Sequence, residues 1–264
     1  MATATIDGWE FAYSDTGTGP SVVLLHGLLM DRTMWDHQID ALSDSYRVIT
    51  VDAPGHGESP GRPVGFTLAE ESAALTKLVT GLGVDQAVWG GHSLGAFNSL
   101  CVVLDAPERV RALILIDGNA GPENPDMVPQ YDAMFEVAKQ DGVSLDLANV
   151  AFTILSTEAF ASSAEGQHWV KKISAMDANS AEGTARAVFD RTSRLSELPK
   201  VTTPTLILHG VDDFPNPIEG AREAAAAIPN AELIEIEACG HTAPVEKPVE
   251  VTTAIRAFLG RLPE

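Results

Sequence analysis

Short runs of apolar residues alternate with longer amphipathic stretches along most of the chain. The apolar runs have the length of β-strands and occupy residues 22–25, 47–51, 86–89, 112–116, 205–208 and 233–236. Stretches of helical length separate most of these runs, for example residues 67–80 and 217–228. This alternation predicts an α/β fold in which a mainly parallel central sheet is flanked by helices on both faces. Residues 3–15 are expected to add an antiparallel hairpin at one edge of the sheet.

The alternation stops between residues 119 and 199, where four stretches have a helical pattern and none resembles a strand. The four predicted helices cover residues 129–140, 145–155, 166–176 and 181–193. We expect an all-helical cap above the carboxyl ends of the strands, where parallel sheets bind their ligands. The predicted division is a first core part at 1–118, a helical cap at 119–199 and a second core part at 200–264. The large side chains that could line a pocket under this cap are Met127, Met134, Phe135, Phe152, Phe160, Trp169, Met176 and Phe189.

Length and composition narrow the class of protein. With 264 residues, of which 45% are hydrophobic, the chain can bury one large core. The net charge of −20 disfavours nucleic acids and anionic membrane surfaces as partners. We find no signal-peptide pattern at the N-terminus and no apolar stretch of the ~20 residues that a membrane helix needs. Cys101 and Cys239 suggest neither a disulfide framework nor a metal site. These features predict a cytoplasmic protein and leave its oligomeric state open.

The pentapeptide Gly91-His92-Ser93-Leu94-Gly95 fits the pattern Gly-x-Ser-x-Gly and directly follows a predicted strand. A buried helix is predicted over residues 96–104, so strand, turn and helix occur in the order of a nucleophile elbow. Such an elbow exposes the serine hydroxyl at a sharp turn, and glycine is needed where the strand and the helix crowd together. Ser93 is therefore the candidate nucleophile, placed to attack a carbonyl group.

A nucleophilic serine requires a base and a carboxylate that orients this base. His241 lies in a short loop after the last predicted strand, and among the seven histidines it alone fits the role of base. Asp212 and Asp213 follow the strand predicted at 205–208. The order Ser, Asp, His along the chain is the order found in nucleophile-elbow hydrolases.

Stabilisation of the developing oxyanion requires backbone N–H donors. One donor is expected to be the amide of Leu94, directly after the nucleophile, and the other the amide of Leu28, in the loop after residues 22–25. The remaining histidines of the loop motifs are expected to satisfy backbone groups or to pack; they are His26, His56, His92 and His209.

Taken together, these motifs resemble the α/β-hydrolase fold superfamily, and within it the serine esterase and lactonase-like members that carry a helical cap. The motifs in family order are His26-Gly27, the segment DAPGHGES at 52–59, the elbow around Ser93, Gly210-x-x-Asp213, and Gly240-His241 followed by Glu246-Lys247-Pro248. The resemblance spans nearly the whole chain outside the predicted cap. It implies that Asp213 is the acid of the triad. Asp117 stands at the strand end from which some members draw this acid, and is the competing position.

The resemblance implies a serine hydrolase that cleaves carboxylic esters of a small to medium, largely apolar substrate through an acyl-enzyme, without a metal or organic cofactor. Serine at position 93 argues against haloalkane dehalogenases and epoxide hydrolases, which use aspartate there. Carbon–carbon bond hydrolases usually have a glycine-rich stretch after His-Gly, and perhydrolase-type members often carry proline near it, whereas this chain has Leu28-Leu29-Met30. The alternatives that stay open are a lactonase, a carbon–carbon bond hydrolase, a cofactor-free oxygenase and, from another class, a non-catalytic receptor for a small molecule.

Overall fold

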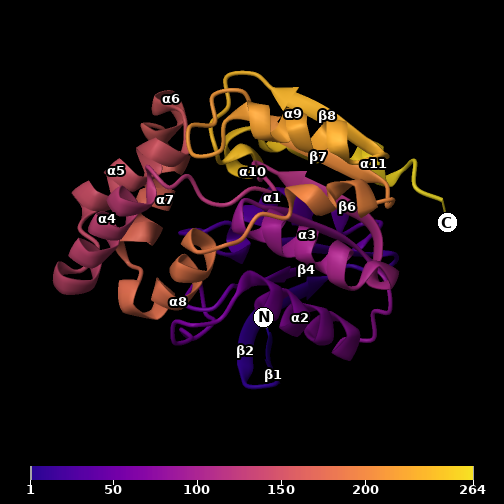
Figure 1. Ribbon diagram of the computed structural model, residues 1–264, viewed down its shortest axis with the longest axis horizontal. Helices are drawn as coiled ribbons and strands as arrows, with labels where there is room; N and C mark the ends of the chain where they lie inside the picture. The colour runs from indigo at the N-terminus through magenta and orange to yellow at the C-terminus, as the bar shows by residue number, and fades with distance from the viewer. Residues whose placement is uncertain (1, 264) are drawn as a thin grey trace.

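A computed structural model describes residues 2–263 and places an eight-stranded sheet at the centre of the molecule (Figure 1). The strand order is β1-β2-β4-β3-β5-β6-β7-β8. The hairpin of β1 and β2 pairs antiparallel with β4 at one edge, and all other neighbours are parallel. The predicted mainly parallel sheet with an antiparallel edge is therefore confirmed. The strands are β1 Ala2–Ile6, β2 Trp9–Thr16, β3 Ser21–Leu25, β4 Arg47–Val51, β5 Ala87–His92, β6 Val110–Ile116, β7 Thr205–Gly210 and β8 Ala231–Ile236.

Helices cover both faces of the sheet because successive side chains of each buried strand point to opposite faces. In β3, Val23 and Leu25 pack with residues of α2, α3 and α9, whereas Val22 and Leu24 pack with residues of α1 and α11. These helices are α1 Asp36–Leu42, α2 Leu68–Gly81, α3 Leu94–Asp105, α9 Ile218–Ala227 and α11 Pro248–Leu259, and the short α10 Ala243–Glu246 precedes the last of them. None of the helices within residues 2–263 is long and apolar enough to cross a membrane.

Five α-helices lie between β6 and β7 and gather at one side of the sheet (Figure 1), and a short 3-10 helix, Leu195–Lys200, precedes β7. The five α-helices are α4 Val128–Asp141, α5 Leu145–Leu155, α6 Glu158–Ala161, α7 Ala164–Ser174 and α8 Ala178–Phe189. Four of them begin after a side chain that caps the helix N-terminus, namely Ser144, Thr157, Ser163 and Asp177. Residues 119–199 hold no strand, as the sequence predicts, although α6 was not predicted and α8 ends four residues earlier than expected. The division of the chain at residues 118 and 199 into core and cap stays a prediction.

One carboxyl group is buried between helices without a charged partner. Glu71 of α2 is 0% exposed, and neither carboxyl oxygen has a hydrogen-bond partner among the described residues. Burial raises the pKa of Glu71 from 4.5 to about 7, and the nearby Asn98 side chain offsets only part of this effect. The folded protein therefore keeps a proton on Glu71 at a pH where the unfolded chain has released it.

This difference predicts how stability depends on pH. Because the pKa is higher in the folded state, the free energy of unfolding should decrease as pH rises from 4.5 to about 7. At about 1.36 kcal/mol per pKa unit, this one group contributes about 3 kcal/mol to the decrease in the free energy of unfolding. Glu71→Gln should remove this decrease, and Glu10→Gln, at an exposed position of β2, should keep it. Urea unfolding below and above this pH range measures the change in the free energy of unfolding with pH. An equal change in wild type and in Glu71→Gln would contradict the expectation.

Candidate active site

Ser93 stands between the end of β5 and the start of α3, with backbone angles φ 51° and ψ −110°. A positive φ is rare for a residue other than glycine and marks a strained turn. Two glycines make the turn possible. A Cβ atom at Gly91 would lie 2.2 Å from the carbonyl carbon of Gly95, and a Cβ atom at Gly95 would lie 2.1 Å from the carbonyl oxygen of Leu25. The strand–turn–helix elbow predicted from the sequence is therefore present, and its glycine positions have no room for a side chain.

His241 and Asp213 are brought together by the loops after β8 and β7. The Nδ1 atom of His241 lies 2.8 Å from Oδ2 of Asp213, and both side chains are buried. The other oxygen of Asp213, Oδ1, accepts the backbone N–H of Asn216 at 2.8 Å. The carboxylate is thus held on both sides and fixes the imidazole with a proton on Nδ1, which leaves Nε2 as the basic atom.

Ser93 and His241 line the same cavity. No hydrogen bond joins Ser93 Oγ to the imidazole in residues 2–263. Contacts of this kind are often long before substrate binds and shorten in the reactive complex. The structure therefore brings all three residues predicted from the sequence into one site, with the His241–Asp213 contact already formed.

The charges of this pair stabilise each other. Burial alone would raise the pKa of Asp213, but the neighbouring His241 and His209 outweigh burial and hold the pKa at about 2. Burial alone would lower the pKa of His241, but the Asp213 carboxylate raises it above the ordinary value of 6.5. A base whose charged form is stabilised in this way is suited to accept a proton from a serine hydroxyl.

The loop that carries Leu28 is a tight turn. The N–H of Met30 donates to the carbonyl of Gly27 at 3.1 Å, and Leu29 has a φ of 66°. The backbone N–H of Leu29 donates to Nε2 of His56 at 3.3 Å. Burial lowers the pKa of His56 to about 3, so this ring is neutral and can accept. These contacts fix the turn next to Ser93. Leu28 and Leu94 both line the cavity, which is the position that an oxyanion site at their backbone amides requires.

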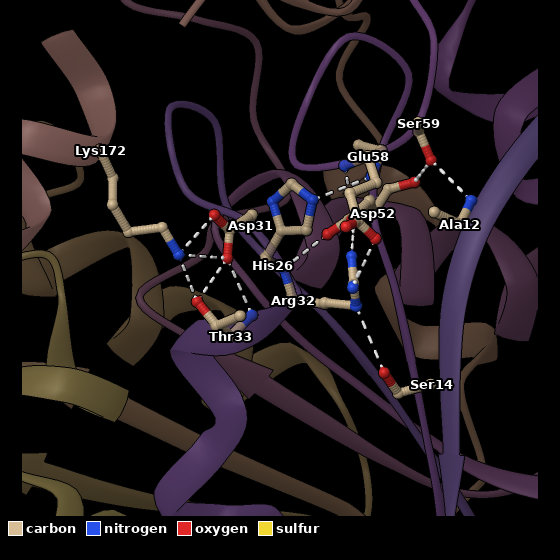
Figure 2. A network of polar contacts seen from close by, with 11 residues as sticks. Ala12, Ser14, His26, Asp31, Arg32, Thr33, Asp52, Glu58, Ser59 and Lys172 are labelled. Carbon is tan, nitrogen blue, oxygen red and sulfur yellow. Dashed lines mark hydrogen bonds and ion pairs between the residues drawn. The ribbon is translucent and has the colours of Figure 1, made fainter. Parts of the chain in front are cut away.

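A network of charged side chains around the buried Asp52 supports the same loop (Figure 2). The carboxylate of Asp52 accepts the backbone N–H groups of Arg32 at 2.8 Å and Glu58 at 3.0 Å, and it pairs with the Arg32 guanidinium. Lys172 of α7 reaches Asp31, which directly precedes Arg32, at 2.7 Å. The helices between β6 and β7 are therefore tied to the loop after β3 through an ion pair that Figure 2 shows beside the Asp52 network. In this structure the segment DAPGHGES at 52–59 supports the loop that carries Leu28 and does not line the cavity.

Asp117, the competing acid, makes other contacts. Its Oδ1 accepts the N–H of Gly210 and its Oδ2 accepts the N–H of Ala243, both at 2.9 Å. Burial raises the pKa of Asp117 to about 6. Both oxygens are thus occupied by the backbone of the two loops that carry Asp213 and His241. The geometry favours Asp213 as the partner of His241 and gives Asp117 the role of holding the loops together.

One of the loop histidines, His209, contacts the site more closely than the sequence indicated. His92 and His209 satisfy backbone carbonyls, those of His241 and Asn216, as expected. In addition, Nε2 of His209 lies 3.2 Å from Oδ2 of Asp213. The four-residue spacing of His209 and Asp213 around a strand end is the signal that could have revealed this contact. Asn216, which donates to Asp213, was also missed.

A metal at this place would have to displace contacts that are already made. Among the described residues, Asp117, His209 and Asp213 bring three possible metal ligands within 4.8 Å of one another. Both oxygens of Asp117 accept backbone N–H groups, and Asp213 accepts from His241 and Asn216. These contacts describe a hydrogen-bonded cluster that positions the base.

The cavity above Ser93 has a volume of about 950 Å³, its open mouth included. Its walls are mainly apolar, and α4, α5 and α8 supply much of them. Of the large side chains that the sequence suggested, Met134, Phe135 and Phe189 line this cavity, whereas Phe152 and Trp169 are buried in the core. The lining residues are Leu28, Leu29, Leu68, Ser93, Leu94, Phe97, Asn119, Glu123, Tyr131, Met134, Phe135, Ala151, Ile154, Leu155, Val188, Phe189, Arg191, Pro215, Asn216 and His241.

Comparison with known proteins agrees with this geometry. The family described as the alpha/beta hydrolase fold matches residues 20–248. The chain is similar to a thermophilic esterase from Thermogutta terrifontis, solved with malate bound, at 31% identity over 99% of both chains and a TM-score of 0.92. It is also similar to the non-heme chloroperoxidase CPO-A1 of Kitasatospora aureofaciens, at 32% identity over 90% of both chains. A pimeloyl-[acyl-carrier protein] methyl ester esterase from Nitrosomonas europaea is 27% identical over 86% of this chain and 90% of its own. Because the family match covers most of the chain, this protein belongs to the α/β-hydrolase fold family.

Proposed function

We propose that this protein is a serine hydrolase that cleaves carboxylic ester bonds of a small to medium, largely apolar substrate. One observation carries the proposal: Ser93 stands on a strained elbow in the wall of an apolar cavity that also exposes His241, itself bound to Asp213. This arrangement supplies a nucleophile, a base and an orienting carboxylate in one place. The likeness to a solved esterase at 31% identity supports the same assignment.

In the proposed reaction, Ser93 Oγ attacks the ester carbonyl while Nε2 of His241 takes the hydroxyl proton. The amides of Leu28 and Leu94 stabilise the oxyanion, a contribution of about 3 kcal/mol for each donor. His241 then gives its proton to the departing alcohol, which leaves the acyl group on Ser93. Water attacks this acyl-enzyme with His241 again as base, and the acid product leaves. Asp213 holds the neutral imidazole in the required tautomer and stabilises its charged form, and His241 takes part in every proton transfer.

A lactone is a cyclic ester and would react by the same steps, so lactonase activity is part of the same proposal. We place water as the second nucleophile, since Leu29 and Met30 stand where perhydrolase-type members often carry proline. The helices α4, α5 and α8 act in this proposal as a cap whose side chains select the substrate. We also infer that the cap corresponds to residues 119–199.

Steady turnover of a neutral ester such as 4-nitrophenyl butyrate tests the proposal. Because the pKa of His241 is raised above 6.5, and the base must be neutral to act, kcat/KM should fall as pH decreases through a midpoint above 6.5. Stopped-flow release of 4-nitrophenol shows whether turnover continues after the first equivalent, and steady-state release across pH measures the pH dependence of kcat/KM. Release of a single equivalent without further turnover would contradict the proposal and favour the receptor alternative.

A further inference from the structure

One wall of the cavity carries an ion pair that the proposed reaction does not use. Nη1 of Arg191 lies 2.5 Å from Oε2 of Glu123, and the two side chains are 7% and 11% exposed. Both residues line the cavity, in walls that are otherwise mainly apolar. Burying an ion pair costs solvation that the contact alone does not always return, so the presence of this pair is not by itself evidence of a stabilising role.

The contacts of Arg191 leave part of its guanidinium available. Nε donates to the carbonyl of Gly121 at 3.1 Å, and Nη1 donates to Glu123 and, at 3.0 Å, to the carbonyl of Val188. The N–H groups of Nη2 have no hydrogen-bond partner in residues 2–263. The group also lies over the ring of Phe97, 5.7 Å from its centroid, so its position is fixed on the cavity wall. Because Nη2 is not among the fully buried polar atoms and Arg191 lines the cavity, these N–H groups are accessible to a ligand acceptor.

The charge around these donors decides which acceptor fits. Glu123 already neutralises Arg191, and the nearby Asp213 adds a negative charge behind His241. A carboxylate on the substrate would therefore enter a site in which Glu123 already neutralises the positive charge of Arg191. An uncharged oxygen can accept the Nη2 hydrogen bonds without adding a charge to a buried site.

We infer that Arg191 is a specificity-determining residue that donates to an uncharged acceptor oxygen of the substrate, such as a ketone, ether or second ester carbonyl. The inference rests on the proposed ester hydrolysis and narrows its substrate class to neutral esters with a second oxygen function. Glu123 sets the preference, because it keeps the Arg191 wall neutral and excludes substrates that carry a carboxylate.

A set of three isosteric esters tests the inference. The 4-nitrophenyl esters of 4-oxopentanoate, 4-methylpentanoate and succinate differ only in whether the acyl end carries a ketone, a methyl branch or a carboxylate. Butyrate esters of 5-hydroxypentan-2-one, 4-methylpentan-1-ol and 4-hydroxybutanoate place the same three groups on the alcohol side. In one of the two sets, wild type should hydrolyse the keto ester with a kcat/KM about tenfold above that of the alkyl ester, the size of a hydrogen bond to a charged donor.

Two substitutions separate the roles of the pair. Glu123→Gln should shift the ratio of kcat/KM for the carboxylate ester to that for the keto ester upward by about tenfold, because Arg191 loses its counter-charge. Arg191→Met should abolish the keto preference. Since Arg191→Met leaves Glu123 buried without its partner, the double variant Glu123→Gln/Arg191→Met tests the same loss in a neutral wall. The exposed pair of Arg222 and Glu235 offers the matched control, and Arg222→Met/Glu235→Gln should keep the wild-type ratios.

Equal kcat/KM values within both sets, a wild-type preference for the carboxylate esters, or a keto preference that survives in the double variant would overturn the inference. In each of these cases the proposed function would still stand, because the esters are hydrolysed. Absence of Ser93-dependent hydrolysis of every ester would instead overturn the proposed function, and with it the inference that rests on it.

Discussion

Replacement of Ser93 by alanine is expected to lower kcat for ester hydrolysis by about 10⁶-fold, the loss seen when the nucleophile of a serine triad is removed. The elbow geometry makes this substitution informative, because alanine adds no volume at a position whose neighbours leave none. The cavity, His241 and the amides of Leu28 and Leu94 would remain in place. The measurement is steady-state hydrolysis of 4-nitrophenyl butyrate by freshly purified Ser93→Ala.

The control for this substitution is Ser45→Ala, at an exposed position between α1 and β4, which should keep the wild-type rate. A thermal unfolding curve that matches wild type would show that Ser93→Ala is folded. Hydrolysis by folded Ser93→Ala at a rate within tenfold of wild type would exclude Ser93 as the nucleophile.

Asp213→Asn should lower kcat by about 10⁴-fold, since an amide no longer fixes His241 in the tautomer that leaves Nε2 basic. It should also move the acid limb of the pH profile to lower pH, because the carboxylate that raises the pKa of His241 is gone. The loss of kcat therefore tests whether Asp213 fixes the tautomer of His241, and the shift of the acid limb tests whether its charge raises the pKa of His241. The pH dependence of kcat/KM measures both.

Asp117→Asn is the matched comparison, because Asp117 is equally buried and belongs to the same cluster. Its two oxygens accept the amides of Gly210 and Ala243, and an asparagine NH₂ group would face one of these donors. The expected result is a loss of stability of about 1–3 kcal/mol, with a decrease in kcat far smaller than that of Asp213→Asn. A larger loss of kcat in Asp117→Asn than in Asp213→Asn would make Asp117 the acid of the triad.

The parts of the fold that follow from local patterns could be predicted from the sequence. The apolar runs predicted all six parallel strands, and the structure extends several of them by one to three residues. The elbow could be predicted because a turn with no room for side chains requires glycine, and Gly91 and Gly95 are visible in the sequence. Leu29 is a counterexample: a branched residue at φ 66° gives no signal in sequence, and its turn is fixed by the distant His56.

Contacts between distant segments were beyond the sequence patterns. Glu123 and Arg191 pair across 68 residues, and both lie in the part of the chain where no strand order restricts the packing. The cavity wall shows the same limit, because an amphipathic helix has one apolar face whether that face meets the core or a ligand. Phe152 of α5 packs in the core, whereas Ile154 of the same helix lines the cavity. Only the three-dimensional arrangement separates the two.

Locating the acyl group during turnover tests most directly whether Ser93 is the nucleophile. Rapid acid quenching of the wild-type protein with 4-nitrophenyl butyrate, followed by mass spectrometry of its peptides, should find one butyryl group on the peptide that contains Ser93. The same treatment of Ser93→Ala should leave this peptide unmodified. A butyryl group on another residue, or hydrolysis by wild type without any acylated protein under conditions that trap the intermediate, would show that Ser93 does not carry the acyl group.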